Sequence, residues 1–273
     1  MTDTSIDAIF DRLTRRAALS GAAAVAASSG AWAQSSAGTV LITGASRGIG
    51  LEMARKYAAR GANVIATARE PGRSEDLRAL AAANKNVRLE GLDVVNLDQI
   101  DALATELKGT AIDVLINNAG ISGGAKNQVF GQIKYDVFDP VMHTNVRGPL
   151  KMAEAFFDHV AASAQKKLVN ISSTEGSIGT LIQRPDFRNY FYRASKAALN
   201  MVMVNVAKAV KDKGVIVGIL SPGLVRTEFT EGLNLPIMIS AEQSATACID
   251  VIDKMTIEQS GVFLRHSGGG VPW

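Results

Sequence analysis

Two side chains in the last third of the chain have the types and spacing of a proton-transfer pair. Tyr192 and Lys196 are four residues apart in a pattern that continues to Val204 and is typical of a helix, so they share one helix face. A phenol ordinarily has a pKa of about 10, and a neighbouring ammonium lowers that pKa by stabilising the phenolate. The pair is therefore suited to exchange a proton with a carbonyl or alcohol oxygen.

A second group of residues has the spacing of a phosphate-binding turn. The sequence G-x-x-x-G-x-G lies between the apolar run 39–42 and a helical pattern over 51–60. Glycine lets the backbone turn sharply, and the N–H groups at the start of a helix bind a pyrophosphate. The spacing differs from the commoner G-x-G-x-x-G, but its position between strand and helix predicts a dinucleotide site. Its predicted contacts are Gly44, Ser46, Arg47, Gly48, Ile49 and Gly50.

Arg69 follows the second predicted strand, which covers residues 63–68, and its position bears on the choice between NAD and NADP. An acidic side chain there would bind the ribose hydroxyl of NAD, whereas this chain has Arg69. Guanidinium groups form paired hydrogen bonds with phosphate oxygens, so Arg69 and Arg47 favour NADP(H) over NAD(H). Two alternatives stay open: both arginines are solvated surface residues, or Glu70 turns inward to the ribose.

Apolar runs of strand type alternate with helical stretches along the chain. Besides the two strands above, such runs lie at 87–92, 112–116, 168–171 and 215–220. The alternation predicts an α/β fold, a single doubly wound Rossmann-type domain over residues 38–273 with a parallel sheet of about seven strands and helices on both faces. Asp139-Pro140 fits a helix start with Asp139 as cap, and Ser240 to Gln243 fits a capping box.

The composition excludes several classes of protein. Of 273 residues, 47% are hydrophobic and 20% charged, as in a folded globular chain. The net charge of +3 without a long basic run gives no support to a nucleic-acid partner. Cys248, the only cysteine, excludes an internal disulfide and is expected to be buried and inert. Three scattered histidines predict no metal site.

The first 33 residues have the order of an export signal. Arg15 and Arg16 precede an alanine-rich apolar run over 17–27, and Ala31-Trp32-Ala33 fits a cleavage site before Gln34. The run is about half the ~20 residues that a membrane span needs. The pattern predicts a twin-arginine signal over residues 1–33, periplasmic localisation and no stable membrane span. The alternative is an alanine-rich surface helix on a cytoplasmic enzyme.

The order of motifs resembles that of the short-chain dehydrogenases/reductases. Asn117-Asn118-Ala119-Gly120, Asn170-Ile171-Ser172-Ser173 and Ser221-Pro222-Gly223 accompany the glycine turn and Tyr192-x-x-x-Lys196 from about Gly38 to the C-terminus. The stretch 192–200 and the ending 268–273 look most like the carbonyl reductases of the C-factor and sniffer type. The resemblance implies an NADP-dependent oxidoreductase that transfers hydride between a nicotinamide and a small-molecule carbonyl or alcohol, working as a homodimer or homotetramer.

The resemblance also implies roles for single residues. Tyr192 would be the general acid/base, Ser173 would bind the substrate oxygen, Lys196 would hold the nicotinamide ribose and lower the pKa of the tyrosine, and Asn145 would position a water beside Lys196. Ser172 is the alternative to Ser173. The implied cofactor contacts outside the glycine turn are Arg69, Asp93, Val94, Asn118, Ala119, Gly120, Tyr192, Lys196, Pro222, Gly223, Val225 and Thr227. A nucleotide-bound sensor or binding module without turnover is the alternative function.

One departure from the family pattern lies beside the predicted site. Ser173 and Tyr192 are 19 positions apart, which leaves roughly six residues more than in many members of the family. The extra segment, within 180–190, contains Arg184, Phe187 and Arg188. It either shapes the mouth of the substrate site or forms a plain surface loop.

Overall fold

The computed structural model describes residues 38–184, 189–230, 232 and 234–273. The predicted export signal over residues 1–33 lies outside the described residues, and so do Phe187 and Arg188 of the extra segment. Among the described residues, no helix is both long and apolar enough to cross a bilayer.

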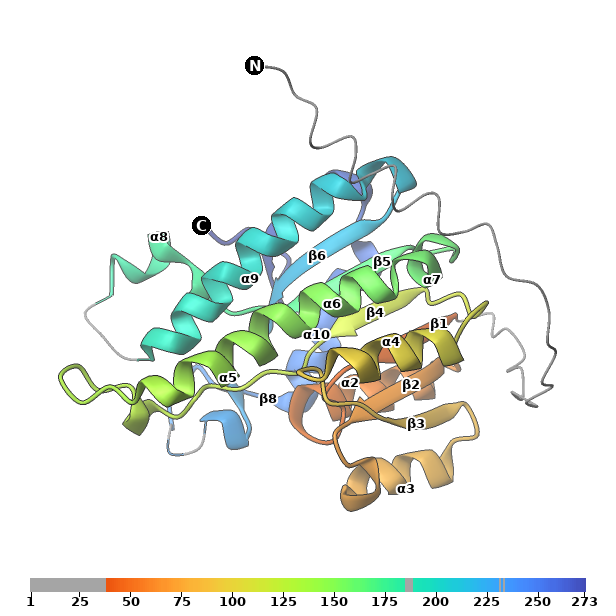
Figure 1. Ribbon diagram of the computed structural model, residues 1–273, viewed down its shortest axis with the longest axis horizontal. Helices are drawn as coiled ribbons and strands as arrows, with labels where there is room; N and C mark the ends of the chain where they lie inside the picture. The colour runs from red at the N-terminus through yellow and green to blue at the C-terminus, as the bar shows by residue number, and fades with distance from the viewer. Residues whose placement is uncertain (1–37, 185–188, 231, 233) are drawn as a thin grey trace. The chain divides into compact units, whose positions relative to one another are not determined.

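One parallel sheet of seven strands organises the described chain (Figure 1). Its strands are β1 (Thr39–Ile42), β2 (Asn63–Ala68), β3 (Val87–Gly91), β4 (Val114–Asn117), β5 (Lys167–Ile171), β6 (Ile216–Ser221) and β9 (Phe263–Arg265), in the order β3-β2-β1-β4-β5-β6-β9. Every residue of β1, β2, β4 and β5 is buried, because helices cover both faces of the sheet. The predicted Rossmann-type fold is confirmed.

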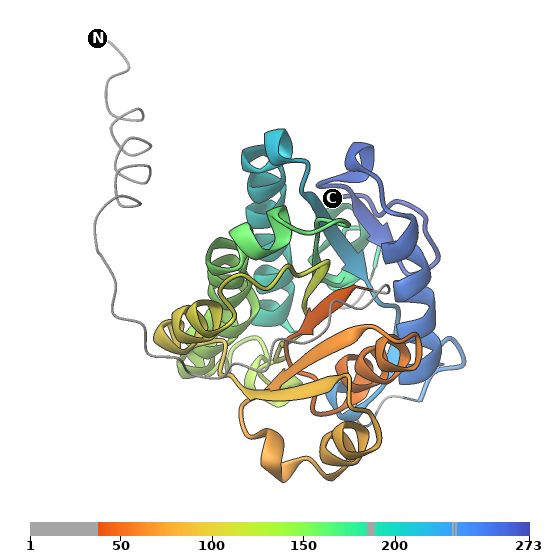
Figure 2. The same cartoon turned by 90° about the vertical axis from the view of Figure 1, so that its right-hand side faces the viewer.

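Two groups of helices cover the two faces of the sheet (Figure 2). One group contains α2 (Gly48–Ala59), α3 (Glu75–Ala83) and α10 (Ala241–Lys254), and the other contains α4 (Leu97–Glu106), α5 (Phe138–Met142), α6 (Gly148–Ala155), α7 (Phe157–Ala161) and α9 (Tyr190–Ala209). A short helix, α8 (Ile178–Leu181), precedes α9. A small second sheet pairs β7 (Val225–Arg226) with β8 (Ile239–Ser240). Met53, Ile42 and Ile249 belong to the core between the main sheet and the first helix group.

Of the two predicted helix caps, one is confirmed and one is wrong. Ser240 and Gln243 form the predicted capping box of α10. By contrast, α5 begins at Phe138, and Asp139 lies inside its first turn instead of capping it. The cause is the preceding 3₁₀ turn, which brings Val137 into helical torsions so that the chain enters α5 without a side-chain cap. The helix that contains Tyr192 and Lys196, α9, begins at Tyr190.

The strand order reverses between β1 and β4, which are neighbours although two strands separate them in sequence. In such sheets the connections at the carboxyl ends of these two strands leave in opposite directions and open a crevice there. The turn after β1, which starts at Thr43, and the segment after β4, which starts at Asn118, therefore form the two sides of one site.

Candidate active site

Gly44 and Gly50, in the turn after β1, lie so close to neighbouring parts of the chain that no side chain fits there. Gly44 has φ +67°, and a Cβ atom built on it would lie 2.8 Å from the Cα of Ala119. A Cβ on Gly50 would collide with the carbonyl oxygen of Gly44 and the side-chain amide of Asn118. Only a residue without a side chain fits either position, so the turn lies directly against the segment after β4.

The start of α2 fits the pyrophosphate of a dinucleotide. Its N-cap residue, Arg47, makes no side-chain hydrogen bond to the helix, and the first turn contains no acidic residue. The first N–H groups of a helix have no partner within the helix, and the helix dipole favours an anion near them. With a glycine, Gly48, at the first position of the helix, the residues present fit a pyrophosphate.

Thr43 joins the two sides of the crevice and was not among the predicted site residues. Its hydroxyl oxygen accepts hydrogen bonds from the N–H groups of Asn118 and Ala119, at 3.0 and 3.1 Å. The side-chain amide of Asn118 donates in return to the carbonyl oxygens of Thr43 and Gly44, both at 3.0 Å. These hydrogen bonds join the glycine turn to Asn118 and Ala119, and together the joined segments form the floor of the crevice.

The arginines predicted to bind a 2′-phosphate lie at the edge of this floor. Arg69 follows β2 and is exposed. Arg47 forms an exposed ion pair with Glu228 at 2.9 Å, which links the glycine turn to the segment after β7. Glu70, the acid that could have turned inward, pairs with Arg73 at 2.7 Å.

The remaining predicted cofactor contacts follow other strands of the sheet. Asp93 and Val94 follow β3, and the Asp93 carboxylate accepts the N–H of Val95 at 3.2 Å. Pro222 and Gly223 follow β6, and Val225 lies in β7. Thr227 reaches the glycine turn, because its methyl group lies 3.3 Å from where a Cβ of Gly48 would be.

Ser173 and Tyr192 meet at the carboxyl end of β5. The Ser173 side chain lies close enough to the Tyr192 hydroxyl to lower the pKa of the phenol, although the two residues belong to different segments. Ser173 precedes the 3₁₀ turn η6 (Thr174–Gly176), and Tyr192 lies in the first turn of α9, with its ring 5.2 Å from that of Phe229. The alternative serine is occupied elsewhere, because buried Ser172 donates to Asn200 at 2.5 Å.

The pKa of Tyr192 differs from the value expected of a tyrosine beside a lysine. Burial raises it to about 12, the hydrogen bond with Ser173 lowers it and the charge of Glu175 raises it. The Lys196 ammonium lies 5.8 Å from the centroid of the phenol ring and donates to the carbonyl oxygen of Ile171 at 2.8 Å. The expected lowering is therefore absent in the protein alone, because loss of hydration outweighs the other effects. Tyr192 stays protonated at neutral pH.

Lys196 is buried, and burial lowers its pKa from 10.5 to about 8. Asn145 approaches it from a neighbouring element of the same helix layer: a Cβ on Gly120 would lie 3.3 Å from the Asn145 oxygen and 3.8 Å from the Lys196 nitrogen. The fold thus brings both predicted residues to Gly120.

A π-helical turn, His143–Arg147, places Asn145 in the site. Such turns are frequent at functional sites. The fully buried Asn145 amide donates to the carbonyl oxygen of Ile121 at 2.8 Å and to the hydroxyl of Ser195 at 2.9 Å, and its oxygen accepts the Ile121 N–H at 2.9 Å. Ser195 was not predicted as a site residue, although it immediately precedes Lys196.

Two more residues that sequence reasoning missed contact the start of α9. Gln128, buried in the loop after β4, accepts the N–H of Phe191 at 2.7 Å and so caps α9. Glu175 in η6 pairs with Arg193 and Arg184. Helix caps usually come from the residue just before the helix, so the sequence around α9 contains no signal for Gln128.

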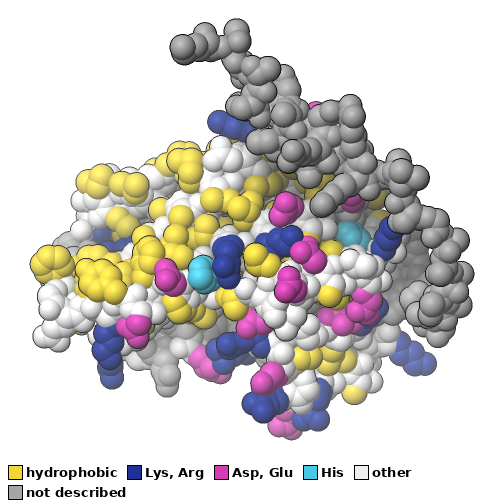
Figure 3. Space-filling view, viewed as in Figure 1, with side chains coloured by type: hydrophobic (Ala, Val, Ile, Leu, Met, Phe, Trp, Pro, Cys, Tyr) yellow, Lys and Arg dark blue, Asp and Glu magenta, His cyan; other side chains and the backbone are white. Residues whose placement is uncertain are grey.

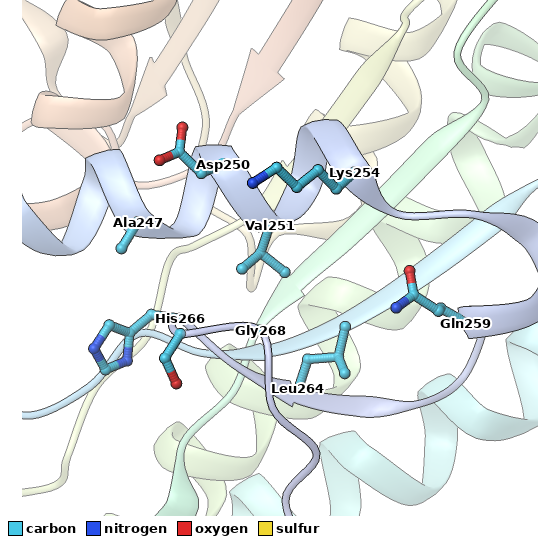
Figure 4. A pocket seen from close by; sticks show the side chains of 9 residues that line it. Ala247, Asp250, Val251, Lys254, Gln259, Leu264, His266 and Gly268 are labelled. Atoms are coloured by element: carbon cyan, nitrogen blue, oxygen red, sulfur yellow. The ribbon is translucent and has the colours of Figure 1, made fainter.

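A pocket of about 430 Å³ lies elsewhere, between α10 and β9 (Figure 4). Asp250, Val251 and Lys254 from α10 lie on one side, and Leu264 and His266 on the other. None of the predicted site residues is among its lining residues. The described residues also contain no cluster of three His, Cys, Asp or Glu that could hold a metal ion. Cys248 is buried, as predicted.

Comparisons with known proteins agree with this geometry. Residues 38–236 match the family model described as short chain dehydrogenase. The chain is 34% identical over 238 residues to a 1-hydroxy-2-glutathionyl-2-methyl-3-butene dehydrogenase of Rhodococcus sp. (strain AD45), with 86% of this chain and 99% of the relative covered.

Two solved structures are also similar to this chain. An NADPH-bound carbonyl reductase from chicken fatty liver superimposes with a TM-score of 0.80 at 31% identity, over 86% of this chain and 98% of that one. The carbonyl reductase Sniffer of D. melanogaster gives 0.76 at 25% identity, over 86% and 99%. The chain therefore belongs to the short-chain dehydrogenase family and is an oxidoreductase of that family.

Proposed function

We propose that the protein is an NADP-dependent carbonyl reductase in which Tyr192 exchanges a proton with the substrate oxygen. The observation that carries the proposal is the approach of Ser173 and Lys196 to the phenol of Tyr192, beside the crevice that fits a dinucleotide. The similar carbonyl reductase structures, one of them NADPH-bound, support the same reaction.

The roles follow from the environments of the side chains. Bound NADP(H) supplies or accepts the hydride at its nicotinamide ring. Tyr192 is protonated at neutral pH and donates its proton to a carbonyl oxygen, while the Ser173 hydroxyl hydrogen-bonds the same oxygen as negative charge develops there. Lys196 holds the nicotinamide ribose, and Asn145 keeps the segment at Ile121 and Gly120 in register with α9.

NADP(H) is the proposed nucleotide because of the charges beside the end of β2. Arg69 is exposed at the strand end, and the nearest acid, Glu70, is paired with Arg73. Binding of a 2′-phosphate would place it beside Arg69 and Arg47, where paired hydrogen bonds favour phosphate over a hydroxyl.

The test is NADPH oxidation by the full chain with a panel of aldehydes, ketones and quinones, with Tyr192→Phe beside it. We expect turnover that Tyr192→Phe reduces by about 10²- to 10⁴-fold, because a positioned acid contributes that much. NADPH affinity is expected to stay unchanged. Retained NADPH binding with no turnover of any carbonyl by the wild-type chain would contradict the proposal and favour the sensor function.

Self-association through the layer of α5, α6 and α9 is part of the proposal. Apolar side chains gather over these helices (Figure 3), and Phe130, Tyr135, Leu150 and Met201 are between 41% and 79% exposed. Exposed apolar patches of this kind mark interaction surfaces. We expect a dimer or tetramer by light scattering, dissociated by Met201→Glu, whereas a monomeric wild-type chain would contradict this part.

Export by a twin-arginine signal over residues 1–33 also belongs to the proposal. It rests on the sequence pattern alone. The test is cell fractionation of the wild-type chain and of a variant with both Arg15 and Arg16 changed to Lys. Periplasmic wild type and cytoplasmic variant would support export, and a cytoplasmic wild type would contradict it.

A further inference from the structure

The carboxylate of Glu175 joins three segments that surround the site. Glu175 lies in η6, two residues after Ser173. One of its oxygens accepts a hydrogen bond from the Nε of Arg193 at 2.7 Å, and the other forms an ion pair with Arg184. Arg193 is the neighbour of Tyr192 on α9, and Arg184 belongs to the extra segment.

The ion pair between Glu175 and Arg193 is well shielded from water. The side chain of Glu175 is 21% exposed and that of Arg193 is 14% exposed. Water screens such charges less than exposed ones, and guanidinium–carboxylate hydrogen bonds are strong and directional. Exposed pairs elsewhere in the chain, such as Arg47 with Glu228, are 69% and 68% exposed and are held more weakly.

The same turn contacts α9 at a second point. The side-chain amide of Asn200 faces the carbonyl oxygen of Gly176 at 3.5 Å, and η6 packs against α9. Ser173 therefore reaches Tyr192 from a turn that is fastened to the catalytic helix on both sides, by Glu175 near Arg193 and by Gly176 near Asn200.

We infer that Glu175 is a positioning residue, which holds the Ser173 turn against α9 and ties Arg184 to the same carboxylate. The inference rests on the proposed function, because it assigns a task in that reaction. Arg184 thereby shares a carboxylate with the helix of the proton donor.

Because Glu175 is charged, its replacement should change the pH dependence of the reaction, which the loss of a purely structural contact would not do. Glu175 raises the pKa of Tyr192. Among the described residues, the charged groups near the phenol include Lys196 on its own helix, and Glu175 with Arg193 and Arg184. Removing the carboxylate takes away a negative charge and so favours the phenolate, whereas removing Arg193 takes away a positive charge and disfavours it.

The experiment follows the pH dependence of NADP⁺-dependent alcohol oxidation by the full chain, which needs the phenolate. We expect Glu175→Gln to move the alkaline midpoint down by ~0.5–1 pH unit and Arg193→Gln to move it up. The double variant should return toward the wild-type midpoint, because the two charges are coupled. Glu175→Gln should also lower kcat by about tenfold or more through misplacement of Ser173, and Glu175→Asp should restore part of it.

Glu106→Gln is the matched control, since Glu106 of α4 pairs with Arg88 of β3, and neither residue is in the Ser173 turn or in α9. It should leave both midpoint and kcat unchanged. Wild-type turnover with equal midpoints in all variants would overturn the inference while leaving the proposed function intact. A wild-type chain without turnover, but with NADPH bound, would instead overturn the proposed function, and the inference with it.

Discussion

The side chain of Ser173 lies close to the hydroxyl of Tyr192 and lowers the pKa of that phenol. Ser173 follows a central strand of the sheet and Tyr192 lies on a helix of one covering layer, so their contact depends on how that helix packs on the sheet. The contact has two consequences. It lowers the pKa of Tyr192, and it brings both hydroxyl groups to one position, where a substrate oxygen would lie.

Replacement of Ser173 by Ala should therefore affect the reaction more than the fold. We expect kcat to fall by about 10²- to 10³-fold, because one donor to the developing oxyanion is lost. Steady-state kinetics with NADPH and a turned-over carbonyl would measure it. Ser173→Thr, which keeps the hydroxyl, should recover much of the rate. Ser172→Ala is the comparison, since its hydroxyl is bonded to Asn200; an equal loss of kcat in this variant would favour Ser172 as the catalytic serine.

The buried ammonium of Lys196 should make the free protein less stable at neutral pH. The pKa of Lys196 is about 8 in the folded chain and 10.5 without burial, so the unfolded chain binds more protons between these values. The loss of folding stability caused by burying the ammonium is fully present below about pH 8 and disappears as the pH rises towards 10.5. We expect Lys196→Met to raise the free energy of unfolding at pH 7 by about 1–3 kcal/mol while abolishing turnover.

Denaturant unfolding of the wild-type chain and Lys196→Met at several pH values would measure this effect. The difference between the two proteins should shrink as the pH rises above 8, because all other titrating groups are shared. A difference that stays constant with pH would show that packing, and not the charge, determines it.

Arg69 should discriminate between the two nucleotides. We expect Arg69→Ala to weaken NADPH binding by about tenfold or more and to leave NADH binding unchanged, because only the 2′-phosphate differs. Fluorescence titration with both nucleotides would measure the two affinities. Arg73→Ala is the control from the same loop, since Arg73 is paired with Glu70. An unchanged preference for NADPH in Arg69→Ala would refute the assignment.

A methyl group at Gly50 should disrupt the cofactor turn. In Gly50→Ala the new Cβ would collide with the Gly44 carbonyl and with Asn118, so we expect a loss of about 2 kcal/mol or more of stability and of NADPH affinity. Gly72→Ala is the matched control, because a Cβ there would meet nothing within 4 Å. Thermal unfolding and NADPH titration of both variants would measure the effects; equal behaviour would contradict the close approach seen at Gly50.

Much of the fold was predictable because its signals are local. The buried strands read as short continuous apolar runs, and β1 and β2 have the predicted bounds. The capping box at Ser240 was equally local, since its two partners are three residues apart. The failed cap at Asp139 is the converse case, because an adjoining turn, and no feature of Asp139 itself, started the helix.

The residue types and spacings determined the α/β class, the glycine turn and the pair Tyr192 and Lys196, since helical periodicity alone puts the latter on one face. Tertiary structure decided which serine reaches the phenol, how strongly burial shifts the pKa of Tyr192, and that Gln128 and Glu175 hold α9. The physical reason is that hydration and long-range hydrogen bonds depend on groups far apart in the chain, which meet only when the helices pack on the sheet.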